Sequence, residues 1–546
     1  MPVRDPIGDE PAMSAAGTEK SPSLSRTAAL ARRRGDRPRH CKPRLRDSIF
    51  GVKRGGKRII AAICGGIWLL GGLAEQTSAQ VRLPDIGEGA GGIITDADER
   101  RLGKEFMRSM RSRLAIIDEP PIDEYIEGLG DALAAHSDRP RDIDFTFFVV
   151  DDDDINAFAA PGGYIGIYAG LILATRSEGE LASVMAHEIA HVSQRHILQS
   201  LERSSQASLP TMAGILVALL LGSQNAEIGQ ATVAGVLGSA MQGRIDFTRE
   251  KEAEADRIGI RLLAKAGFDP LGMANFFETL QRDSRFRQQP PPFLSTHPIT
   301  GDRLAEARNI ALGLEKGDHP DPIDYHAVRT WLRVRNTDDP QELARRFEEE
   351  AADIEARAPA DGKDAEGAAK RYGLGLSLMR SGREEEGRKA MAHLVEEYPR
   401  ILAFRSSLGE SLLRSGKNAE ALDLYAEGAA RLPNSKGMIG RFAKALIDND
   451  RAQEALDEID RFARRKEVDA RTQRLRAQAL QMLGRQVDSR IALAESYALN
   501  DRLADAIGQL LLALEAEKSG ERRSRGRISR INARLAELRA ERDGRR

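Results

Sequence analysis

Cysteine is almost absent from this chain of 546 residues. The two cysteines, Cys41 and Cys64, both lie near the N-terminus. The remainder of the chain therefore holds no disulfide scaffold, no cysteine zinc finger and no cysteine nucleophile. A body without thiols also runs no risk of wrong disulfides in an oxidising compartment.

Aromatic residues are few as well, at 5% of the chain, a share that is low for a β-sandwich and more typical of helical repeats. The chain also lacks an excess of charge of either sign, because 82 Lys and Arg stand against 83 Asp and Glu. We therefore expect no nucleic-acid partner. The length and a hydrophobic share of 41% predict two or more domains with sizeable cores.

The N-terminal region lacks a hydrophobic run as long as the roughly 20 residues that a membrane span needs. Its apolar run, residues 59–73, follows Lys57 and Arg58 and precedes the small residues Thr77-Ser78-Ala79. This order predicts a signal peptide over residues 59–79. The alternative is a tether to the inner membrane through residues 59–73.

The segments on either side of the predicted signal peptide have a biased composition. Residues 1–58 are rich in Arg, Ser and Pro without apolar periodicity, which predicts a disordered basic tail. Such a tail is unusual before a signal peptide. One explanation is that the assigned start codon lies too far upstream and that translation begins near Val52. Residues 80–95 are rich in glycine and are predicted to be a linker.

Helical and strand patterns are mixed in the next segment, which predicts an α+β domain over residues 96–314. The expected elements are a helical region at 96–133, a buried strand at 145–150, a Pro-Gly-Gly turn at 161–163 before a short strand, a helix at 177–201 that opens with a Ser177–Glu180 capping box, and a helix at 250–263. Residues 209–241 are a second apolar region. They are either a hairpin that covers a cleft or makes peripheral contact with a membrane, or plain core helices.

Turn residues recur at a fixed interval in the C-terminal part. Gly382, Gly416, Asp450 and Gly484 are evenly spaced within helical patterns. Their interval equals the tetratricopeptide period of about 34 residues. We expect four to five helical hairpins over residues 366–546. A turn at Asn500-Asp501 comes half a period later.

Two further segments border the repeats. The closing helix is expected to have one apolar face, formed by Ile528, Ile531, Leu535 and Leu538. Residues 315–365, before the repeats, are predicted to be a charged helical linker.

The helix expected at 177–201 carries His187-Glu188-Ile189-Ala190-His191, an HExxH motif. Histidines four residues apart lie about 40° apart on one face of a helix, so the two imidazoles can hold one zinc ion. Glu188 lies beside them, where it can act as the general base that takes a proton from water.

A catalytic zinc site needs a third protein ligand. The position of a third histidine in the extended motif is taken by Ile197, and His196, a turn further along the helix, is expected to point away. A distant carboxylate is the better candidate. Glu252 and Asp256 are four residues apart on the next helix, so one can bind the metal while the other accepts a hydrogen bond from a ligating imidazole.

Together these motifs carry a family resemblance. HExxH followed by Glu-x-x-x-Asp, with Pro-Gly-Gly-Tyr-Ile before it, resembles the zinc metallopeptidases of the HtpX and CAAX-prenyl-endopeptidase superfamily. Residues 254–259 (Glu-Ala-Asp-Arg-Ile-Gly), residues 295–298 (Ser-Thr-His-Pro) and the repeats are similar to the BepA-type periplasmic branch, which lacks the transmembrane helices of HtpX. The resemblance covers residues 95–310 closely and the repeats loosely.

The resemblance implies a zincin-type peptidase with one zinc ion per chain. It implies that His187, His191 and Glu252 bind the zinc, that Glu188 is the general base, and that Asp256 supports a ligating imidazole. An edge strand that aligns an extended peptide by backbone pairing is implied for Gly163, Tyr164, Ile165, Gly166, Ile167 and Tyr168.

His297 matches a loop histidine that, in that branch, can reach the metal. It could fill the fourth position on the zinc and hold the peptidase off as a gate. It could instead donate a hydrogen bond to the oxyanion of the reaction. Apart from the match, a surface histidine beside a loop proline is the plainest interpretation.

We therefore expect a secreted zinc endopeptidase joined to an all-α tetratricopeptide-repeat solenoid. By resemblance, it acts in the periplasm on misfolded or stalled outer-membrane proteins, in contact with their assembly machinery, and its repeats bind protein clients. The alternative is a non-proteolytic chaperone or assembly scaffold built on the repeats. An intact HExxH with its distant glutamate argues against a silent peptidase fold.

Overall fold

The computed structural model describes residues 94–139, 142–204, 211–214, 216, 249–285, 290–355, 364–520 and 523–543. The predicted basic tail and signal peptide, nearly all of the linker at 80–95 and most of the apolar region at 209–241 lie outside these residues. None of the helices in the described part of the chain has both the length and the apolar character that a membrane crossing requires.

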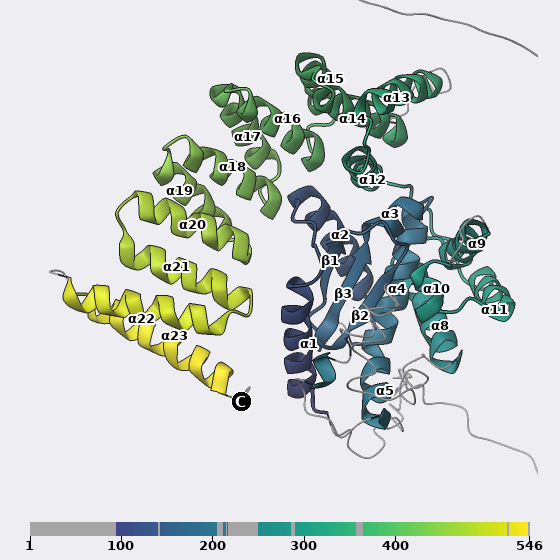
Figure 1. The fold of residues 1–546 in the computed structure, drawn as a ribbon, viewed down its shortest axis with the longest axis horizontal. Coiled ribbons are helices and arrows are strands. Elements are labelled where there is room, and N and C mark those ends of the chain that lie inside the picture. The colour runs from purple at the N-terminus through teal and green to yellow at the C-terminus, as the bar shows by residue number, and fades with distance from the viewer. Residues whose placement is uncertain are drawn as a thin grey trace, which may run out of the picture. The chain divides into compact units, whose positions relative to one another are not determined.

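A three-stranded sheet organises the first domain (Figure 1). Its strands are β1 (Thr146–Val150), β2 (Ala157–Ala160) and β3 (Tyr164–Tyr168), in the order β1-β3-β2. The predicted strand at 145–150 and the turn at 161–163 are confirmed. The prediction that residues 163–168 form the edge strand is wrong, because β3 pairs with β1 on one side and with β2 on the other. The edge strands are β1, whose outer side is bridged by Ile116 at Val150, and β2. The alanine-rich sequence of β2 lacks the β-branched residues typical of strands.

Helices cover both faces of the sheet. Successive side chains of a strand point to opposite faces, so each strand contributes to both cores. One face packs against α2 (Pro120–Ala134) and α4 (Glu178–Ser193), and the other packs against α1 (Asp96–Arg111). The side chains toward α2 and α4 are Phe147, Val149, Ala157, Ala159, Ile165 and Ile167. Those toward α1 are Phe148, Val150, Phe158, Ala160 and Tyr168. The helical region predicted at 96–133 is thus two helices on opposite faces.

The helix predicted at 177–201 is interrupted. It divides into α4 and α5 (His196–Ser204), and Arg195 between them takes a positive φ of 55°. The Ser177 hydroxyl accepts from the Glu180 N–H at 3.2 Å, as predicted, but the Glu180 carboxylate accepts from the Arg176 N–H at 3.0 Å. The capping box is therefore only half formed.

Four further helices among the described residues pack in the first domain and bring distant residues to α4. They are α8 (Arg249–Lys265), α9 (Gly272–Ser284), α10 (Pro292–Thr296) and α11 (Gly301–Leu312). A short helix, α3 (Ala169–Ala174), links β3 to α4. Helix α8 approaches α4 closely at Gly259, where a Cβ atom would lie 3.2 Å from the backbone nitrogen of His187. This contact sets α8 directly beside the HExxH motif.

The segment predicted as a charged linker contains two helices, α12 (Ile323–Arg335) and α13 (Pro340–Glu355). Tyr325, Val328 and Leu332 of α12 are buried in the same core as α2 and α4. The Tyr325 hydroxyl is 3.1 Å from the hydroxyl of Thr175. Helix α12 is therefore part of the first domain's core.

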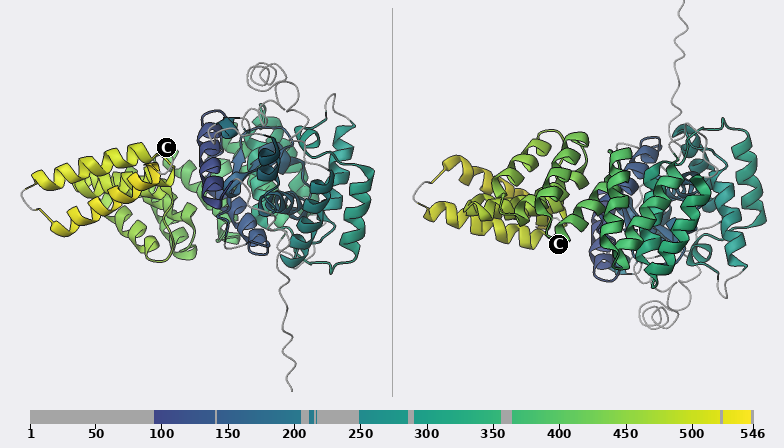
Figure 2. Two further views of the ribbon diagram at one scale, coloured as in Figure 1. Left: turned by 90° about the horizontal axis from the view of Figure 1, so that it is seen from below. Right: turned by 90° about the horizontal axis from the view of Figure 1, so that it is seen from above.

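The C-terminal part is a solenoid of helical hairpins, as predicted (Figures 1 and 2). The turn residues Gly382, Gly416, Asp450, Gly484 and Asp501 all have positive φ, from 59° to 87°. The hairpins are α14 (Ala365–Arg380) with α15 (Glu384–Glu397), α16 (Leu402–Arg414) with α17 (Asn418–Arg431), α18 (Lys436–Asp448) with α19 (Ala452–Ala463), α20 (Ala470–Met482) with α21 (Gln486–Leu499), and α22 (Leu503–Ser519) with α23 (Arg525–Asp543).

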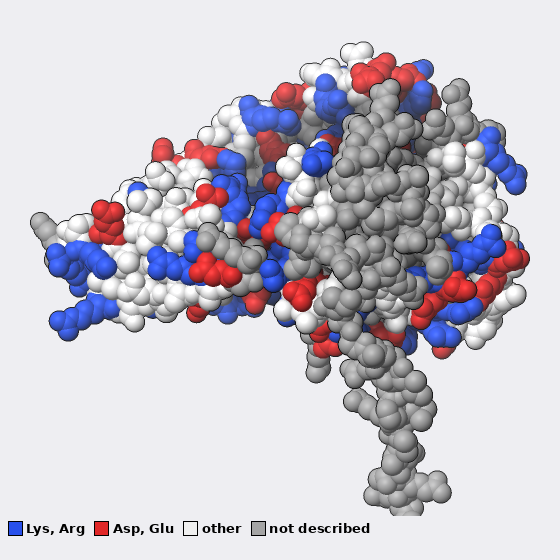
Figure 3. All heavy atoms as spheres, turned by 60° about the horizontal axis from the view of Figure 1, so that its bottom comes forward, with Lys and Arg blue, Asp and Glu red and all other residues white. Residues whose placement is uncertain are grey.

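The closing helix and the surface charge also follow the sequence. Ile531, Leu535 and Leu538 of α23 are buried against α22, whereas Ile528 is half-buried. Basic and acidic side chains are interspersed on the face shown in Figure 3, in keeping with a net charge of −1.

Candidate metal centre

Three elements bring four potential metal ligands together in the first domain. Helix α4 supplies His187 and His191, α8 supplies Glu252, and His297 follows directly after α10. All four side chains are buried, and each offers one ligand atom within 4.8 Å of the other three. The cluster unites the two predicted histidines with the distant glutamate predicted on a second helix.

The spacing of these atoms suits a tetrahedral zinc ion. The Nε2 atoms of His187 and His191 are 2.9 Å apart, and Nδ1 of His297 is 3.3 Å from Nε2 of His187. The Glu252 carboxylate lies 3.4 Å from Nε2 of His191 and 3.0 Å from Nδ1 of His297. Four ligands about 2.0–2.2 Å from a zinc ion would stand roughly 3.3 Å apart in a tetrahedron. The residues therefore fit zinc.

The predicted general base, Glu188, is buried at the edge of the cluster. Its Oε1 has no hydrogen-bond partner among the described residues and lies 3.6 Å from Nε2 of His297. The backbone of Ala159, on edge strand β2, hydrogen-bonds to the carboxylate. Burial raises the pKa of Glu188. A buried carboxylate with an oxygen that accepts no hydrogen bond is suited to take up a proton.

Asp256 lies where the sequence predicts it, behind His187. Its Oδ1 is 3.0 Å from Nδ1 of His187, on the ring side opposite the cluster. A carboxylate in this place keeps the proton on Nδ1 and leaves Nε2 free for a metal. Burial alone would raise the pKa of Asp256, but the close contact with His187 and the hydrogen bonds from Arg303 lower it.

Arg303 is a site residue that the sequence does not reveal. Its guanidinium donates two hydrogen bonds of 2.8 Å to Asp256 and lies 2.9 Å from Glu252. It also donates to the carbonyl of Pro298 at 2.8 Å. Arg303 therefore ties the ligand-bearing helix α8 to the loop that carries His297. No motif marks this arginine, because its role depends on how α11 packs against α8.

His196 does not point away from the site, so that prediction is wrong. The break before α5 turns its side chain back, and Nδ1 of His196 lies 3.0 Å from Nδ1 of His191. Its Nε2 is 3.2 Å from the carboxylate of Glu254. An uninterrupted helix would place residue 196 about 140° around the axis from residue 191.

The charges of the cluster balance within it. Burial alone would raise the pKa of Glu252, but the charge of His297 and hydrogen bonds from His191 and His297 hold it well below its usual range. Burial would lower the pKa of His297, but Glu252 and Glu188 raise it. Burial and the neighbouring His187 lower the pKa of His191. The neutral imidazole that results is the form that binds a metal.

Residues 121–311 match peptidase family M48. These residues form a peptidase M48 domain. This family implies a metal-dependent peptidase fold, and the matched residues include all four side chains of the cluster together with Glu188 and Asp256.

Curated relatives match a longer stretch of the chain. The putative beta-barrel assembly-enhancing protease of Vibrio cholerae is 40% identical over 278 residues, which are 51% of this chain and 57% of the relative. The beta-barrel assembly-enhancing protease of Escherichia coli strain K12 is 34% identical over 318 residues, 58% of this chain and 63% of the relative. The chain thus matches about three fifths of these relatives' length.

A more distant relative matches a shorter stretch. Metalloprotease LoiP of E. coli is 25% identical over 226 residues, which are 40% of this chain and 81% of that protein. Among solved structures, yeast Tom70 aligns with 69% of this chain and 82% of its own at 14% identity and a TM-score of 0.26, a likeness too weak to carry an argument.

Proposed function

We propose that the chain is a zinc-dependent endopeptidase with one zinc ion per chain, held by His187, His191 and Glu252. The observation that carries the proposal is the buried Glu188 carboxylate, whose Oε1 has no hydrogen-bond partner among the described residues and lies beside four converging ligand atoms. Zinc bound there would supply a Lewis acid for the scissile carbonyl. Glu188 would take a proton from the attacking water and carry it to the leaving amine.

The substrate would lie along edge strand β2. The backbone of Ala159 on this strand contacts Glu188, so a peptide paired with β2 would pass directly over the general base. Backbone pairing would align the peptide with little regard to its side chains. This proposal moves the substrate strand from residues 163–168, which lie in the centre of the sheet, to residues 157–160.

His297 would gate the centre by filling the fourth ligand position. The loop is held in place by a hydrogen bond from the Phe293 N–H to the carbonyl of Ile155, 3.2 Å long, just before β2. Phe293 is buried and its ring lies 4.9 Å from that of His297. A substrate that paired with β2 would compete with this contact.

A His297→Ala variant tests the gate. We expect higher proteolysis of casein, or self-cleavage, because the fourth position is open. Proteolysis would be followed by gel electrophoresis and the zinc content by atomic absorption. Reduced turnover with unchanged zinc would instead assign His297 to oxyanion stabilisation and contradict the gate.

The clients would be misfolded or stalled outer-membrane proteins, with the repeats as their binding surface. Two relatives are named for beta-barrel assembly, and stacked helical hairpins commonly bind protein segments. This client would place the protein in the periplasm after export by the signal peptide at 59–79, with the tether through 59–73 as the alternative. The balance of charge in the sequence gives no reason to add a nucleic-acid partner.

Replacement of Glu188 separates an enzyme from a scaffold. Wild type should bind about one zinc per chain and cleave casein, and Glu188→Gln should keep the zinc and lose cleavage. Glu315→Gln, an exposed glutamate outside the helices, is the matched control. If wild type cleaves no client and binds clients as tightly as Glu188→Gln does, the non-proteolytic chaperone or scaffold is favoured. The inactive Glu188→Gln protein can also trap clients for identification.

A further inference from the structure

The two zinc-ligating histidines are supported by different partners. Behind His187 stands the buried carboxylate of Asp256, 3.0 Å away. Behind His191 stands the imidazole of His196, which is only 1% exposed and meets the His191 ring edge to face at a centroid distance of 5.0 Å. Neither the HExxH motif nor the distant carboxylates explain why His196 lies here.

We infer that His196 is a positioning residue that sets the proton and the ring orientation of His191, and that Glu254 does the same for His196. This inference rests on the proposed zinc centre. It concerns residues that touch neither the metal nor the substrate, and it adds Glu254, His196 and Lys251 to the machinery of the site.

The hydrogen-bond chemistry allows one arrangement when His191 binds a metal. Its Nε2 then gives a lone pair to the metal, so the proton of the neutral ring is on Nδ1 and must be donated. The acceptor 3.0 Å away is Nδ1 of His196. A neutral His196 that accepts at Nδ1 carries its proton on Nε2, and this atom lies 3.2 Å from the carboxylate of Glu254. Each donor in the chain from metal ligand to Glu254 therefore meets an acceptor.

The backbone is shaped to put His196 in this place. Arg195 takes a positive φ of 55°, a conformation that residues other than glycine rarely adopt. Its side chain is fixed by the carbonyl of Ile94 at 2.9 Å and by Glu99 at 3.2 Å. Without this break, the helix would carry the side chain of residue 196 away from His191.

Helix α8 holds His196 from the other side. The ammonium of Lys251, beside the ligand Glu252, is buried and donates to the carbonyl of His196 at 2.9 Å and to the Ser200 hydroxyl at 3.0 Å. The same helix supplies Glu254. Helix α8 thus supplies the proposed ligand Glu252. Its residues Lys251 and Glu254 hold His196, which orients the other ligand His191.

Two nearly isosteric variants test the inference in the full chain. His196→Leu keeps the bulk and removes the acceptor, and His196→Asn keeps an acceptor atom close to the position of Nδ1. Loss of such a partner commonly weakens metal binding about 10–100-fold. We expect His196→Leu to raise the zinc dissociation constant at least about tenfold and His196→Asn to recover most of that loss. Competition with a chromophoric chelator measures both, and the visible spectrum of the cobalt-substituted protein reports the ligand geometry.

The controls separate the possible failures. His393→Ala removes an exposed imidazole on α15 and should leave zinc binding unchanged. Glu254→Ala, at a half-exposed position, should weaken zinc binding in the same direction as His196→Leu, and it serves if the latter does not fold. If wild type binds zinc but both His196→Leu and Glu254→Ala bind it as tightly with an unchanged cobalt spectrum, the inference is wrong. If wild type binds no zinc, the proposed function fails with it.

Discussion

The guanidinium of Arg303 offsets part of the buried negative charge at the metal centre. Arg303 is 7% exposed and pairs with both Asp256 and Glu252. Removal of one partner from a buried ion pair leaves an uncompensated charge in a medium of low polarity, which is more costly than the loss of an exposed pair. This residue therefore contributes to stability as well as to the orientation of the site.

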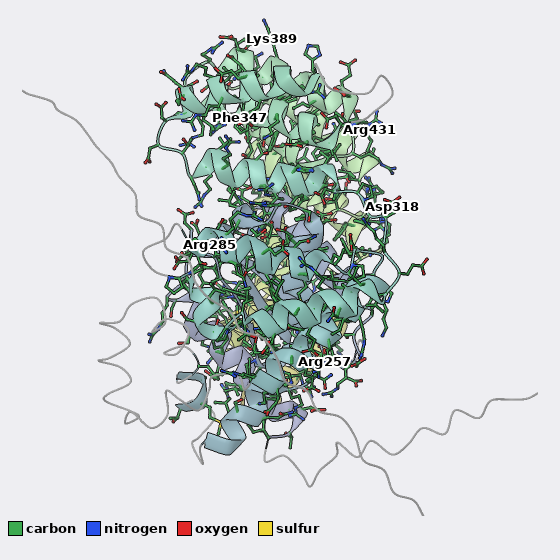
Figure 4. All side chains as sticks on the ribbon, turned by 90° about the vertical axis from the view of Figure 1, so that its right-hand side faces the viewer. Arg257, Arg285, Asp318, Phe347, Lys389 and Arg431 are labelled. Atoms are coloured by element: carbon green, nitrogen blue, oxygen red, sulfur yellow. The ribbon has the colours of Figure 1, made fainter. Side chains whose placement is uncertain are left out.

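We predict that Arg303→Met destabilises the protein by about 3 kcal/mol or more. Arg257→Met is the matched control, because Arg257 of α8 (labelled in Figure 4) pairs with Glu306 at 2.7 Å while both side chains are more than 40% exposed. That exposed pair should be worth less than about 1 kcal/mol. Urea unfolding gives both values, and equal losses in the two variants would contradict the prediction.

Glu178, at the first turn of α4, should make stability depend on pH. Burial, with the nearby Asp321 and Asp324, raises its pKa to about 7 from a usual value of 4.5. Tyr125 donates to one carboxylate oxygen at 2.9 Å and His319 lies 3.1 Å from the other. Between these two pKa values the folded state holds a proton that the unfolded state has lost. Stability therefore falls as the pH rises from about 4.5 to about 7.

We predict that Glu178→Gln melts at a higher temperature than wild type at pH 8 and at the same temperature near pH 4.5. The shift corresponds to about 3 kcal/mol at most. Differential scanning calorimetry across this range measures it, with Glu315→Gln as the control. A difference between wild type and Glu178→Gln that stays constant with pH would show that the charge of Glu178 is not its cause.

The predictability of the site differs from residue to residue. His187 and His191 can be predicted because helical geometry alone places residues i and i+4 on one face. Glu188 can be predicted because it lies next to His187 in the motif. Glu252 and Asp256 can be predicted for the same reason once a second helix is assumed. His196 and Arg303 are not, since one depends on a helix break at Arg195 and the other on the packing of α11 against α8.

At the scale of elements, the close approach of α8 to α4 holds the ligands together. A Cβ atom at Gly259 would lie 3.0 Å from the Met273 side chain and 3.2 Å from the backbone nitrogen of His187. The side chain can move aside, but the backbone of α4 cannot move without shifting the ligands. Gly259 is therefore required by space and not by its φ.

We predict that Gly259→Ala lowers both stability and zinc affinity. Overpacking costs about 1–3 kcal/mol, which exceeds the gain of roughly 0.5–1 kcal/mol that alanine brings to a helix interior. Gly508→Ala in α22, where nothing lies within 4 Å of the added Cβ, should show only the gain. Urea midpoints and chelator competition test the pair. A Gly259→Ala protein as stable as Gly508→Ala would refute the role of this contact.

The repeats are the most predictable elements, and the sheet is less so. The even interval from Gly382 to Gly484 identifies the turns because each needs a residue that tolerates positive φ, and all four have it. The order of the strands is not written in the local pattern. Residues 164–168 have the β-branched and aromatic residues of a strand but no mark that distinguishes a central strand from an edge, and nothing in the short alanine-rich β2 predicts a strand.

At the scale of the whole molecule, α12 is shared between the two domains. Tyr325, Val328 and Leu332 lie in the core of the first domain, whereas Ala327 is buried in the core formed by α14 to α16. Helix α13 belongs with the repeats, because Phe347 (Figure 4) is fully buried and a Cβ at Gly373 of α14 would lie 2.4 Å from its ring. Val334 of α12 also packs with Phe347. The last side chain in the core of the first domain is Leu332, so a cut between α12 and α13, at about residue 338, keeps that core whole.

We predict that a first-domain fragment cut at about residue 338 folds and that one cut before α12 does not. Residues 94–338 should bind zinc, but residues 94–322 should be unfolded, because they lack three core side chains worth about 1.5–3 kcal/mol each in a domain whose total stability is roughly 5–15 kcal/mol. Circular dichroism and zinc content compare the two. If residues 94–322 fold and bind zinc as well as residues 94–338, α12 is a linker whose buried side chains do not contribute to the stability of the first domain.

The same boundary governs the C-terminal fragments. Residues 340–546 should unfold at a higher urea concentration than residues 364–546, because the shorter fragment lacks α13 and leaves the surface of α14 around Gly373 uncovered. Both should be helical, because each hairpin packs on its neighbours, and the contacts of Ser435 and Arg441 with Glu124 and Glu119 of the first domain are additional to this packing. Urea titrations followed by circular dichroism compare the pair. Equal urea midpoints would show that α13 is a linker and does not stabilise the repeats. The absence of a helical signal from residues 364–546 would show that contacts between neighbouring hairpins are not enough to fold the C-terminal half.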